Sequence, residues 1–145
     1  MYICKGSNND MRLKVFFLLI FLSFFSQSIY PLITDGSVGL TENIVAAIKA
    51  GNSKALAQYF STTIEITLPG KEGTFSKVQA EMIIKDFFTK YPPAAFEVNQ
   101  KGSSSGGSQF IIGTYKSNNK LYKTYLLLKP IDKQLLIQQL QFEEN

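Results

Sequence analysis

The side chains that could do chemistry in this sequence are carboxylates, lysines, hydroxyls and phenols. After residue 28 the chain contains no histidine, cysteine, tryptophan or arginine. This composition excludes a Ser-His-Asp triad, a cysteine nucleophile, and a metal site built from imidazoles or thiolates. It also excludes the bidentate arginine fork that usually binds phosphates and carboxylates. Any catalysis would depend on Asp, Glu, Lys, Tyr, Ser or Thr, and we expect no cofactor and no bound metal.

The acidic side chains fall where an ordinary solvated surface would place them. Glu65 stands between two isoleucines in an alternating segment, so it points away from the face that the isoleucines bury. Glu81 and Asp86 each precede a lysine by four residues in a predicted helix. Such pairs contribute about 0.2–0.5 kcal/mol each and are common on exposed helix faces. We therefore expect these carboxylates to be surface groups rather than catalytic acids or bases.

Aromatic side chains are better placed than the acids to line a pocket or an interface. The pair Asn118-Asn119 suits a two-residue hairpin turn, and this turn places Tyr115 opposite Tyr122 in the neighbouring strand. A cross-strand tyrosine pair usually stabilises a sheet by about 0.2–1 kcal/mol, so that structural interpretation stands beside ligand contact. The candidate pocket or interface residues are Tyr59, Phe87, Tyr91, Tyr115 and Tyr125.

Lysines gather near the same hairpin, at positions Lys116, Lys120 and Lys123. They could attract an anionic partner, but lysines at strand edges more often prevent aggregation between sheets. The whole chain carries a net charge of +4, and removal of residues 1–28 would reduce this charge to +2. Because no arginine follows residue 28, the sequence lacks the basic face typical of nucleic-acid binding, and we expect no nucleic-acid partner.

Residues 1–28 have the pattern of a secretory signal peptide. Basic residues, including Arg12 and Lys14, precede an apolar run over residues 15–25, and Ser26 and Ser28 suit a cleavage site. We therefore expect export to the periplasm or the cell exterior. The alternative is a retained N-terminal membrane anchor, which needs about 20 mostly apolar residues. The small and polar residues after position 25, together with Pro31, favour cleavage over anchoring.

The remainder of the chain predicts an irregular lead-in over residues 29–40 and a single domain over residues 41–145. Thr41 suits a helix N-cap and Gly51 suits the end of that helix. A second short helix is expected to run from about residue 53 to Phe60. Residues 64–68 then alternate between apolar and polar types, as in a half-buried strand. Pro69-Gly70 suits the type II turn that leads into a short second strand.

The best-defined element is a long helix that follows this short strand. Ser76 and Gln79 form a capping box, and an apolar pattern with helical spacing follows them. Pro92-Pro93 ends the helix, because proline cannot continue it and disfavours the helical conformation of the preceding residue. We expect the apolar face of this helix to pack on a sheet.

From Phe96 to the end the sequence predicts four strands in series, joined by tight connections as an antiparallel meander. In the last strand, simple alternation places Leu136, Leu140 and Phe142 on one face and Ile137 on the other. Such a strand would be apolar on both sides and buried on both. Two short helices, one long helix and an antiparallel sheet, with the helices grouped on one face, define the α+β class.

The segment IEITLPGKEGTFSKVQAEMIIKDFF, together with Pro92-Pro93, Gly102 and the ending LLIQQLQFEE, resembles a known family. It is similar to the small secreted Bacteroidota proteins of domain of unknown function 4783, over about residues 38–143. The resemblance implies a nuclear-transport-factor-2-like, or cystatin-like, fold. In that fold the helices pack on a curved antiparallel sheet around a conical cavity. The resemblance implies no catalytic or binding residue.

These observations predict an exported, non-catalytic accessory module that binds a small apolar ligand or another envelope protein. One alternative is an isomerase or hydrolase that uses Asp or Glu together with Tyr in the conical pocket. Another is a structural homodimer formed sheet to sheet, which the doubly apolar last strand motivates. Contact with a membrane is expected only through the N-terminal segment, if that segment is not cleaved.

Overall fold

The computed structural model describes residues 36–145, so the predicted signal peptide and residues 29–35 of the predicted lead-in lie outside the described residues. The described helices are α2 (Gly36–Lys49), α3 (Ser53–Ala57) and α4 (Lys77–Lys90). The strands are β1 (Phe60–Leu68), β2 (Lys71–Ser76), β3 (Ala95–Ser103), β4 (Gln109–Ser117), β5 (Lys120–Ile131) and β6 (Gln134–Glu144). Within residues 36–145, no helix has the length and apolar character that a bilayer span requires.

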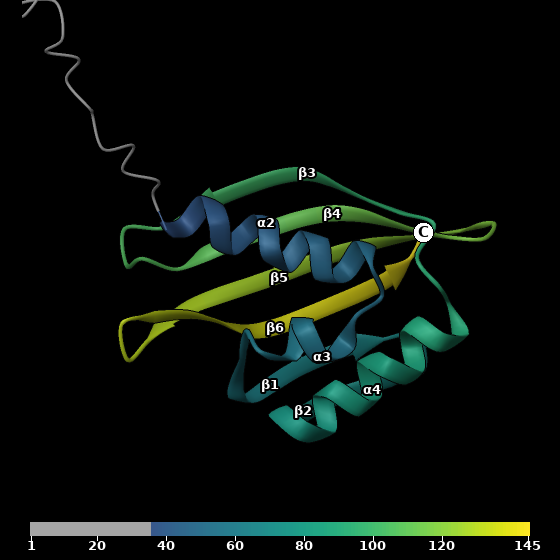
Figure 1. Cartoon of the computed structure of the whole chain (residues 1–145), viewed down its shortest axis with the longest axis horizontal. Helices are drawn as coiled ribbons and strands as arrows, with labels where there is room; N and C mark the ends of the chain where they lie inside the picture. Colours follow the sequence, from purple (N-terminus) through teal and green to yellow (C-terminus); the bar gives the residue numbers. More distant parts are fainter. Residues whose placement is uncertain (1–35) are drawn as a thin grey trace, which may run out of the picture. The chain divides into compact units, whose positions relative to one another are not determined.

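The six strands form one sheet in the order β2-β1-β6-β5-β4-β3. Figure 1 shows α2, α3 and α4 on the same face of this sheet, which we call the inner face, and the opposite face is the outer face. The predicted α+β class and the meander from β3 to β6 are therefore confirmed. One pairing departs from a purely antiparallel sheet, because β1 runs parallel to β6. No short connection joins these two strands, so turn geometry does not set their relative direction.

The local signals around α4 and the central hairpin are confirmed. The Ser76 hydroxyl accepts a hydrogen bond from the backbone N–H of Gln79, and the Gln79 side chain accepts one from the N–H of Ser76. Gly70 has a φ of 79°, as the third position of a type II turn requires. Tyr115 pairs with Tyr122 across the hairpin, in the predicted register.

Both N-terminal helices differ from the prediction at their ends. Helix α2 begins at Gly36, so the described part of the expected lead-in is helical and the prediction of Thr41 as N-cap is wrong. The extra turn brings Leu40 onto the core beside Ile44, its neighbour at i+4. Helix α3 ends at Ala57 instead of Phe60, because Phe60 already pairs with Ile137 of β6 at the start of β1.

The predicted faces of the last strand are also wrong. A β-bulge lies at Gln138, where the partner of Leu128 is Ile137 and the partner of Leu127 is Gln139. The extra residue reverses the alternation, so Ile137 joins Leu140 on the inner face. Leu136 moves to the outer face. The strand therefore has one consistently buried face, and only part of its other face is apolar.

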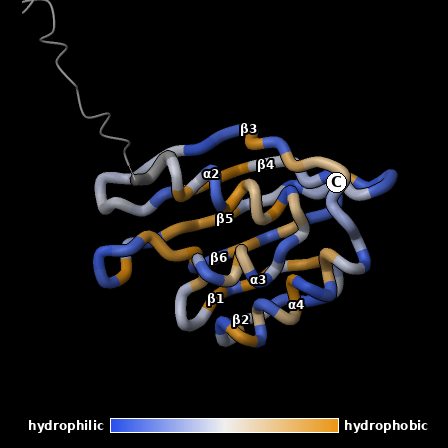
Figure 2. Tube along the Cα trace, viewed as in Figure 1, coloured by the Kyte–Doolittle hydropathy of each residue, from blue (hydrophilic) through white to orange (hydrophobic). Residues whose placement is uncertain are grey.

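The hydrophobic core lies between the inner face and the three helices. Its fully buried side chains include Ile44 and Ile48 from α2, Ile84 from α4, and Leu126 and Leu140 from the sheet. Figure 2 shows hydrophobic residues along the middle of β5, whereas the part of β3 that leads to Ser103 is largely hydrophilic. This contrast is expected, because β5 is a central strand and β3 is an edge strand.

Candidate functional site

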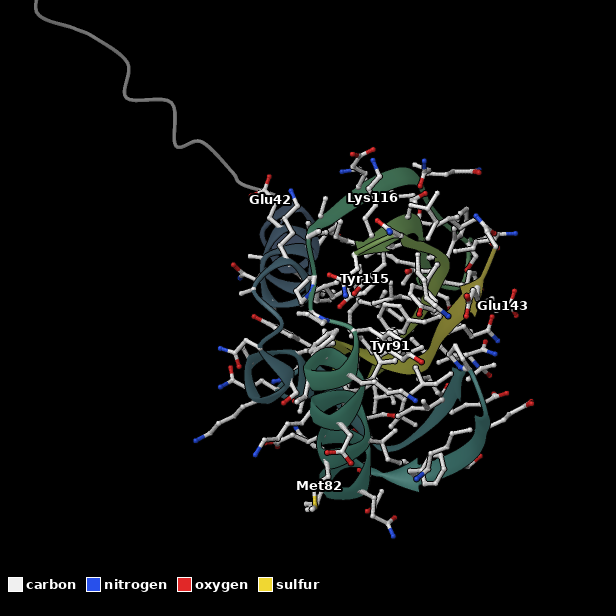
Figure 3. All side chains as sticks on the ribbon, turned by 90° about the vertical axis from the view of Figure 1, so that its right-hand side faces the viewer. Glu42, Met82, Tyr91, Tyr115, Lys116 and Glu143 are labelled. Atoms are coloured by element: carbon white, nitrogen blue, oxygen red, sulfur yellow. The ribbon has the colours of Figure 1, made fainter. Side chains whose placement is uncertain are left out.

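An aromatic cluster fills the space between the second half of α4 and the inner face of the sheet. Phe87 lies at its centre, with ring centroids of Tyr91, Tyr115, Tyr122 and Phe142 at 4.7–5.7 Å. Figure 3 shows Tyr91 and Tyr115 between the helical layer and the sheet. Phe88 completes the cluster at 6.0 Å from Tyr115. These rings pack against one another between α4 and the sheet.

Local periodicity explains how these rings meet. Phe87 and Tyr91 are four residues apart on α4, so they lie on the same side of the helix. Tyr115 and Tyr122 are direct cross-strand partners, and Phe142 lies beside them on β6, next to β5. Tilted and edge-to-face ring pairs of this kind contribute about 0.5–1.5 kcal/mol each beyond their buried area. The cluster therefore fixes the angle between α4 and the sheet.

One hydrogen bond fastens the end of α4 to this cluster. The Tyr115 hydroxyl donates to the backbone carbonyl of Tyr91 at 2.5 Å. Tyr91 is the C-cap residue of α4 and precedes Pro92-Pro93, where the chain leaves the helix. Because terminal carbonyls of a helix lack partners within the helix, the phenol satisfies an acceptor that would otherwise be unpaired. Burial raises the pKa of Tyr115, so this donor stays protonated at neutral pH.

The Tyr122 hydroxyl lies nearby and is buried, and it makes no hydrogen bond of ordinary geometry among the described residues; its closeness to the Tyr91 side chain contributes only weakly to raising the pKa of Tyr122. Burial raises the pKa of Tyr122 by more than the neighbouring Lys120 ammonium lowers it. Lys120 forms an ion pair with Glu144 at 2.6 Å, and this hydrogen bond raises the pKa of Lys120. Both phenols therefore stay protonated at neutral pH, and neither can accept a proton there.

Three of the five candidate aromatic residues come together in the cluster: Phe87, Tyr91 and Tyr115. Tyr59 lies at the junction of α3 and β1, where its backbone carbonyl accepts a hydrogen bond from Ile137. Tyr125 points to the outer face, because it is an odd number of residues from Tyr122 in the same strand. Sequence reasoning left Tyr122, Phe88 and Phe142 out of the candidate set, although the register had already placed Tyr122 beside Tyr115.

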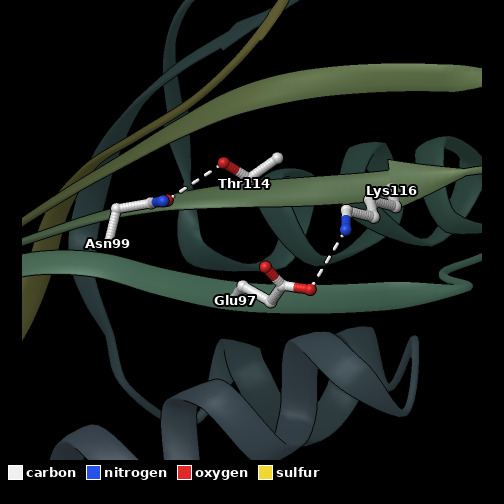
Figure 4. Close-up of polar contacts among 4 residues, drawn as sticks. All are labelled: Glu97, Asn99, Thr114 and Lys116. Atoms are coloured by element: carbon white, nitrogen blue, oxygen red, sulfur yellow. Dashed lines mark hydrogen bonds and ion pairs between the residues drawn. The ribbon is translucent and has the colours of Figure 1, made fainter.

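The candidate carboxylates do not enter the aromatic cluster. Glu65 and Asp86 are exposed, as expected from their places on the polar faces of β1 and α4. The ion pairs within residues 36–145 are Lys120–Glu144 and Lys116–Glu97, the second at 3.1 Å and drawn in Figure 4. In the same range, no three acidic, histidine or cysteine side chains gather as a metal ion would require.

The outer face carries a group of apolar side chains that we call the outer patch. Ile112 pairs with Tyr125, and Phe110 pairs with Leu127, so these four side chains form adjacent cross-strand pairs on β4 and β5. Leu136 of β6 completes the patch after the bulge. All five residues are partly exposed. None of the helices of residues 36–145 covers this face (Figure 1).

The described surface also has hollows away from the aromatic cluster. One of about 620 Å³ lies between the α2–α3 turn and α4 and is lined by polar groups such as Asn52, Lys85 and Thr89. Another, of about 520 Å³, lies between α2 and β3. The second hollow combines apolar and basic side chains, including Val45, Val98 and Lys101.

Removal of the Tyr115 hydroxyl and removal of the Tyr122 hydroxyl are expected to have different consequences for stability. Tyr115→Phe should lower the free energy of unfolding by about 1–3 kcal/mol, because the Tyr91 carbonyl loses its donor. Tyr122→Phe should leave stability unchanged or raise it, because the hydroxyl that it removes is buried and has no partner among the described residues. Urea unfolding of both variants measures the difference. Equal losses for the two variants would contradict the assigned hydrogen bond.

Comparison with known proteins adds a family and a fold. The model of the family described as "Domain of unknown function (DUF4783)" matches residues 41–143. No curated protein matches the sequence. The crystal structure of a DUF4783 family protein from Bacteroides ovatus ATCC 8483 is 28% identical in sequence, with a TM-score of 0.67. The alignment covers 71% of this chain and 93% of that protein.

Two more distant structures share the fold alone. A domain of unknown function with a cystatin-like fold from Nostoc punctiforme is 13% identical, with a TM-score of 0.61, and covers 78% of each chain. An NTF-2 like protein of unknown function from Silicibacter pomeroyi is also 13% identical, with a TM-score of 0.52. That alignment covers 75% of this chain and 92% of the other. These similarities confirm the expected nuclear-transport-factor-2-like, or cystatin-like, fold.

Proposed function

Because the chain belongs to the DUF4783 family, a domain family of unknown function, we propose a function from its own surfaces: it is a non-catalytic protein-binding module. The outer patch is the binding surface, and the partner is another protein. The aromatic cluster has a structural role and holds the sheet in the curvature that presents this surface.

The observation that carries the proposal is the arrangement of Phe110, Ile112, Tyr125 and Leu127. These four side chains form a continuous apolar block on the outer face, and Leu136 extends it onto β6. Gln139 and Gln141 of β6 and Thr114 of β4 border the block with polar, partly exposed groups. An apolar centre with a polar rim is the usual composition of a protein–protein interface.

The dimensions of the outer face are suitable for such an interface. Adjacent strands are about 4.8 Å apart, so β4, β5, β6 and β1 present a face about 14 Å wide between the outer strand axes. Side chains and the neighbouring strands widen it further. The central strands β5 and β6 have 12 and 11 residues, so at about 3.3 Å per residue the four-strand face is about 36–40 Å long and about 500–560 Å² in area before side chains and neighbouring strands enlarge it. A standard interface buries about 800 Å² on each partner, so the whole outer face is of the size required.

The interior supports a binding role rather than catalysis. The rings of the aromatic cluster pack between α4 and the inner face, where the centroids of four other rings lie 4.7–5.7 Å from that of Phe87. The buried phenols of Tyr115 and Tyr122 remain protonated at neutral pH because burial raises their pKa values. General base catalysis requires a group that accepts a proton near the working pH. The acids that could do so, such as Glu65 and Asp86, are exposed, and the Glu144 carboxylate near Tyr122 is paired with Lys120.

The expected place of this function is outside the cytoplasm. Residues 1–28 have the composition of an export signal, and the rest of the chain lacks cysteine, so its folding does not depend on disulfide formation after export. The proposed module is therefore an accessory protein of the cell envelope or the exterior. Its partner would be another exported protein or a second copy of this chain.

Site-specific photo-crosslinking in the producing cells tests the proposal. A benzophenone amino acid at position 125 should give a discrete crosslinked species, because Tyr125 is part of the outer patch and pairs there with Ile112. The same amino acid at Met82, which is 64% exposed on α4, is the matched control and should give none. A crosslinked species of twice the subunit mass identifies a homodimer, and any other mass identifies a different partner. Absence of a discrete adduct at both Tyr125 and Leu127 refutes the proposal.

A further inference from the structure

A second surface feature lies on the other side of the molecule, between α2 and β3. We call it the edge groove; it has a volume of about 520 Å³, and its lining includes Val45, Ala46 and Lys49 of α2 together with Val98 and Lys101 of β3. Figure 1 shows α2 running alongside β3, so the groove has a helix as one wall and a strand as the other. It is separate from the outer patch, which faces away from the helices.

The strand that forms one wall is the last one in the sheet. β3 pairs with β4 on one side, and no described strand pairs with its other side. An edge strand of this kind has backbone N–H and C=O groups that point outward without partners in the sheet. Residues 97–101 of β3 are all exposed, so these groups are open to contact.

A β-bulge at Asn99 determines which side chains enter the groove. Val98 pairs with Gly113 and Lys101 pairs with Ile111, and both partners lie on the inner face. In a regular strand, residues three positions apart would point to opposite faces. The bulge adds one residue and thereby brings an apolar side chain and a lysine to the same side. The Thr114 hydroxyl holds the bulge by donating to Oδ1 of Asn99 at 3.0 Å, as Figure 4 shows.

The apolar wall of the groove includes a side chain that is unusually exposed for a residue on the inner face. Val98 is 39% exposed, whereas Phe96, two residues earlier on the same face, is buried. Val45 and Ala46 of α2 provide the apolar surface opposite it. An apolar side chain inserted between these residues would be removed from water on both sides, which is favourable by about 25 cal/mol per Å² of buried apolar area.

The charged part of the groove is basic. Lys49 and Lys101 line the groove, and neither forms an ion pair within residues 36–145. Glu97 of the same strand does not neutralise them, because it points to the outer face and pairs with Lys116. Glu42 of α2 is the acidic side chain in the lining, so the lysines exceed the acids there. The groove is therefore complementary to an occupant that carries a negative charge.

We propose that the edge groove binds an extended peptide segment of a partner protein, which adds to β3 as a further strand. An apolar side chain of the peptide packs against Val98 and Val45, and an acidic side chain two residues away lies near Lys101. Addition of a strand to a sheet edge takes its affinity from main-chain hydrogen bonds and its specificity from pockets for alternate side chains. The bulge at Asn99 supplies two such contacts, one apolar and one basic.

Two labelled heptapeptides test this inference by fluorescence anisotropy with the purified protein. TVTETVT has valine and glutamate side chains on one face of the extended chain, and TVTKTVT replaces the glutamate by lysine. We expect TVTETVT to bind saturably and at least about tenfold more tightly than TVTKTVT, because like charges across an interface are unfavourable. Failure of both peptides to bind, or equal affinities, would overturn the proposal.

Variants of the groove identify the contacts. Val98→Glu should weaken binding of TVTETVT about tenfold or more, and Lys101→Glu should reverse the preference between the two peptides. Val78→Glu is the matched control, because Val78 is 70% exposed on α4, away from the groove. Lys101 is exposed, so its replacement does not endanger folding. Unchanged affinities in both groove variants would refute the assigned contacts.

A further control distinguishes binding of a partner peptide from occupation of the groove by the chain's own N-terminal segment. Residues 29–33 are replaced by glycine and serine, and the two peptides are titrated again. Affinity that is unchanged by this replacement supports an external occupant. If the peptides bind only after the replacement, the groove receives the protein's own segment, and the proposal of a partner peptide is wrong.

Discussion

Replacement of Phe87 by alanine is expected to lower the free energy of unfolding by about 3–5 kcal/mol. Phe87 is 5% exposed, and its ring lies within 6.1 Å of the rings of Phe88, Tyr91, Tyr115, Tyr122 and Phe142, measured between centroids. The truncation removes the buried ring and leaves a cavity, because the surrounding rings come from three strands and a helix that cannot all close on it. Denaturant unfolding followed by circular dichroism measures the loss.

The matched control for this variant is Met82→Ala. Met82 lies on the same helix but is 64% exposed and points away from the sheet (Figure 3). Its replacement should change the free energy of unfolding by no more than about 0.5 kcal/mol. If Phe87→Ala cost as little as Met82→Ala, the space between α4 and the sheet would not be filled by the aromatic cluster. The aromatic cluster would then have no structural role that excludes a catalytic one.

The second large effect is expected from Gly113→Ala, at about 1–3 kcal/mol of destabilisation. Gly113 lies on the inner face of β4, where an added Cβ would come within 2.7 Å of the Glu97 carbonyl oxygen and 2.7 Å of the Phe96 ring. The carbonyl belongs to the backbone of the paired strand, so it cannot move without disturbing the β3–β4 ladder. Thermal or denaturant unfolding should therefore show a clear loss of stability.

Gly102→Ala is the informative comparison for Gly113→Ala. An added Cβ at Gly102 would come within 2.6 Å of the Phe110 ring, and its three nearest contacts all belong to that side chain rather than to the backbone. Phe110 is partly exposed on the outer face, so its ring can rotate away. We expect a smaller loss than for Gly113→Ala. A larger loss at Gly102 would mean that the Phe110 ring is held more rigidly than the β3–β4 backbone.

Gly102 and Gly113 also show how much of the structure local sequence patterns can predict. Sequence reasoning identified Gly102 as part of the family resemblance, but it had no reason to single out Gly113. A glycine in the middle of a strand signals close approach of another group without naming it. Here the approaching groups are the Phe96 ring and the Glu97 carbonyl, which lie sixteen or more residues earlier in the chain. The glycine in the strand was visible in the sequence, but the groups that require it are brought near Gly113 only by the pairing of β3 with β4.

The candidate site was predictable to the extent that it follows from periodicity. Phe87 and Tyr91 share a helical face, and the hairpin turn at Asn118-Asn119 fixed the pairing of Tyr115 with its neighbour, so three of the five residues meet as the patterns allow. Tyr125 was grouped with them, although the period of two already places it on the opposite face from Tyr122. The prediction that these residues form a pocket or an interface is not tested by their placement.

Bulges account for the features that the sequence did not reveal. At Gln138 one additional residue moves Ile137 into the core and Leu136 to the outer patch. At Asn99 another brings Val98 and Lys101 together in the edge groove. A bulge depends on the registers of two strands at once, and alternation within one strand does not show it. The edge groove therefore depends on a bulge, whereas the outer patch gains only Leu136 from one, because the hairpin register already pairs its other residues.

The amino-acid sequence alone was sufficient to predict the α+β class, the capping box and proline end of α4, and the hairpin register, and it shows that no histidine, cysteine or arginine follows residue 28. These are local properties, set by backbone conformation and side-chain type within a few residues. Other features appear only in the folded molecule: the aromatic rings pack between α4 and the sheet, β1 runs parallel to β6, Leu136 joins the outer patch, and the edge groove forms between α2 and β3. Each of these depends on contacts between distant segments, whose geometry is set by packing of the whole sheet against its helices.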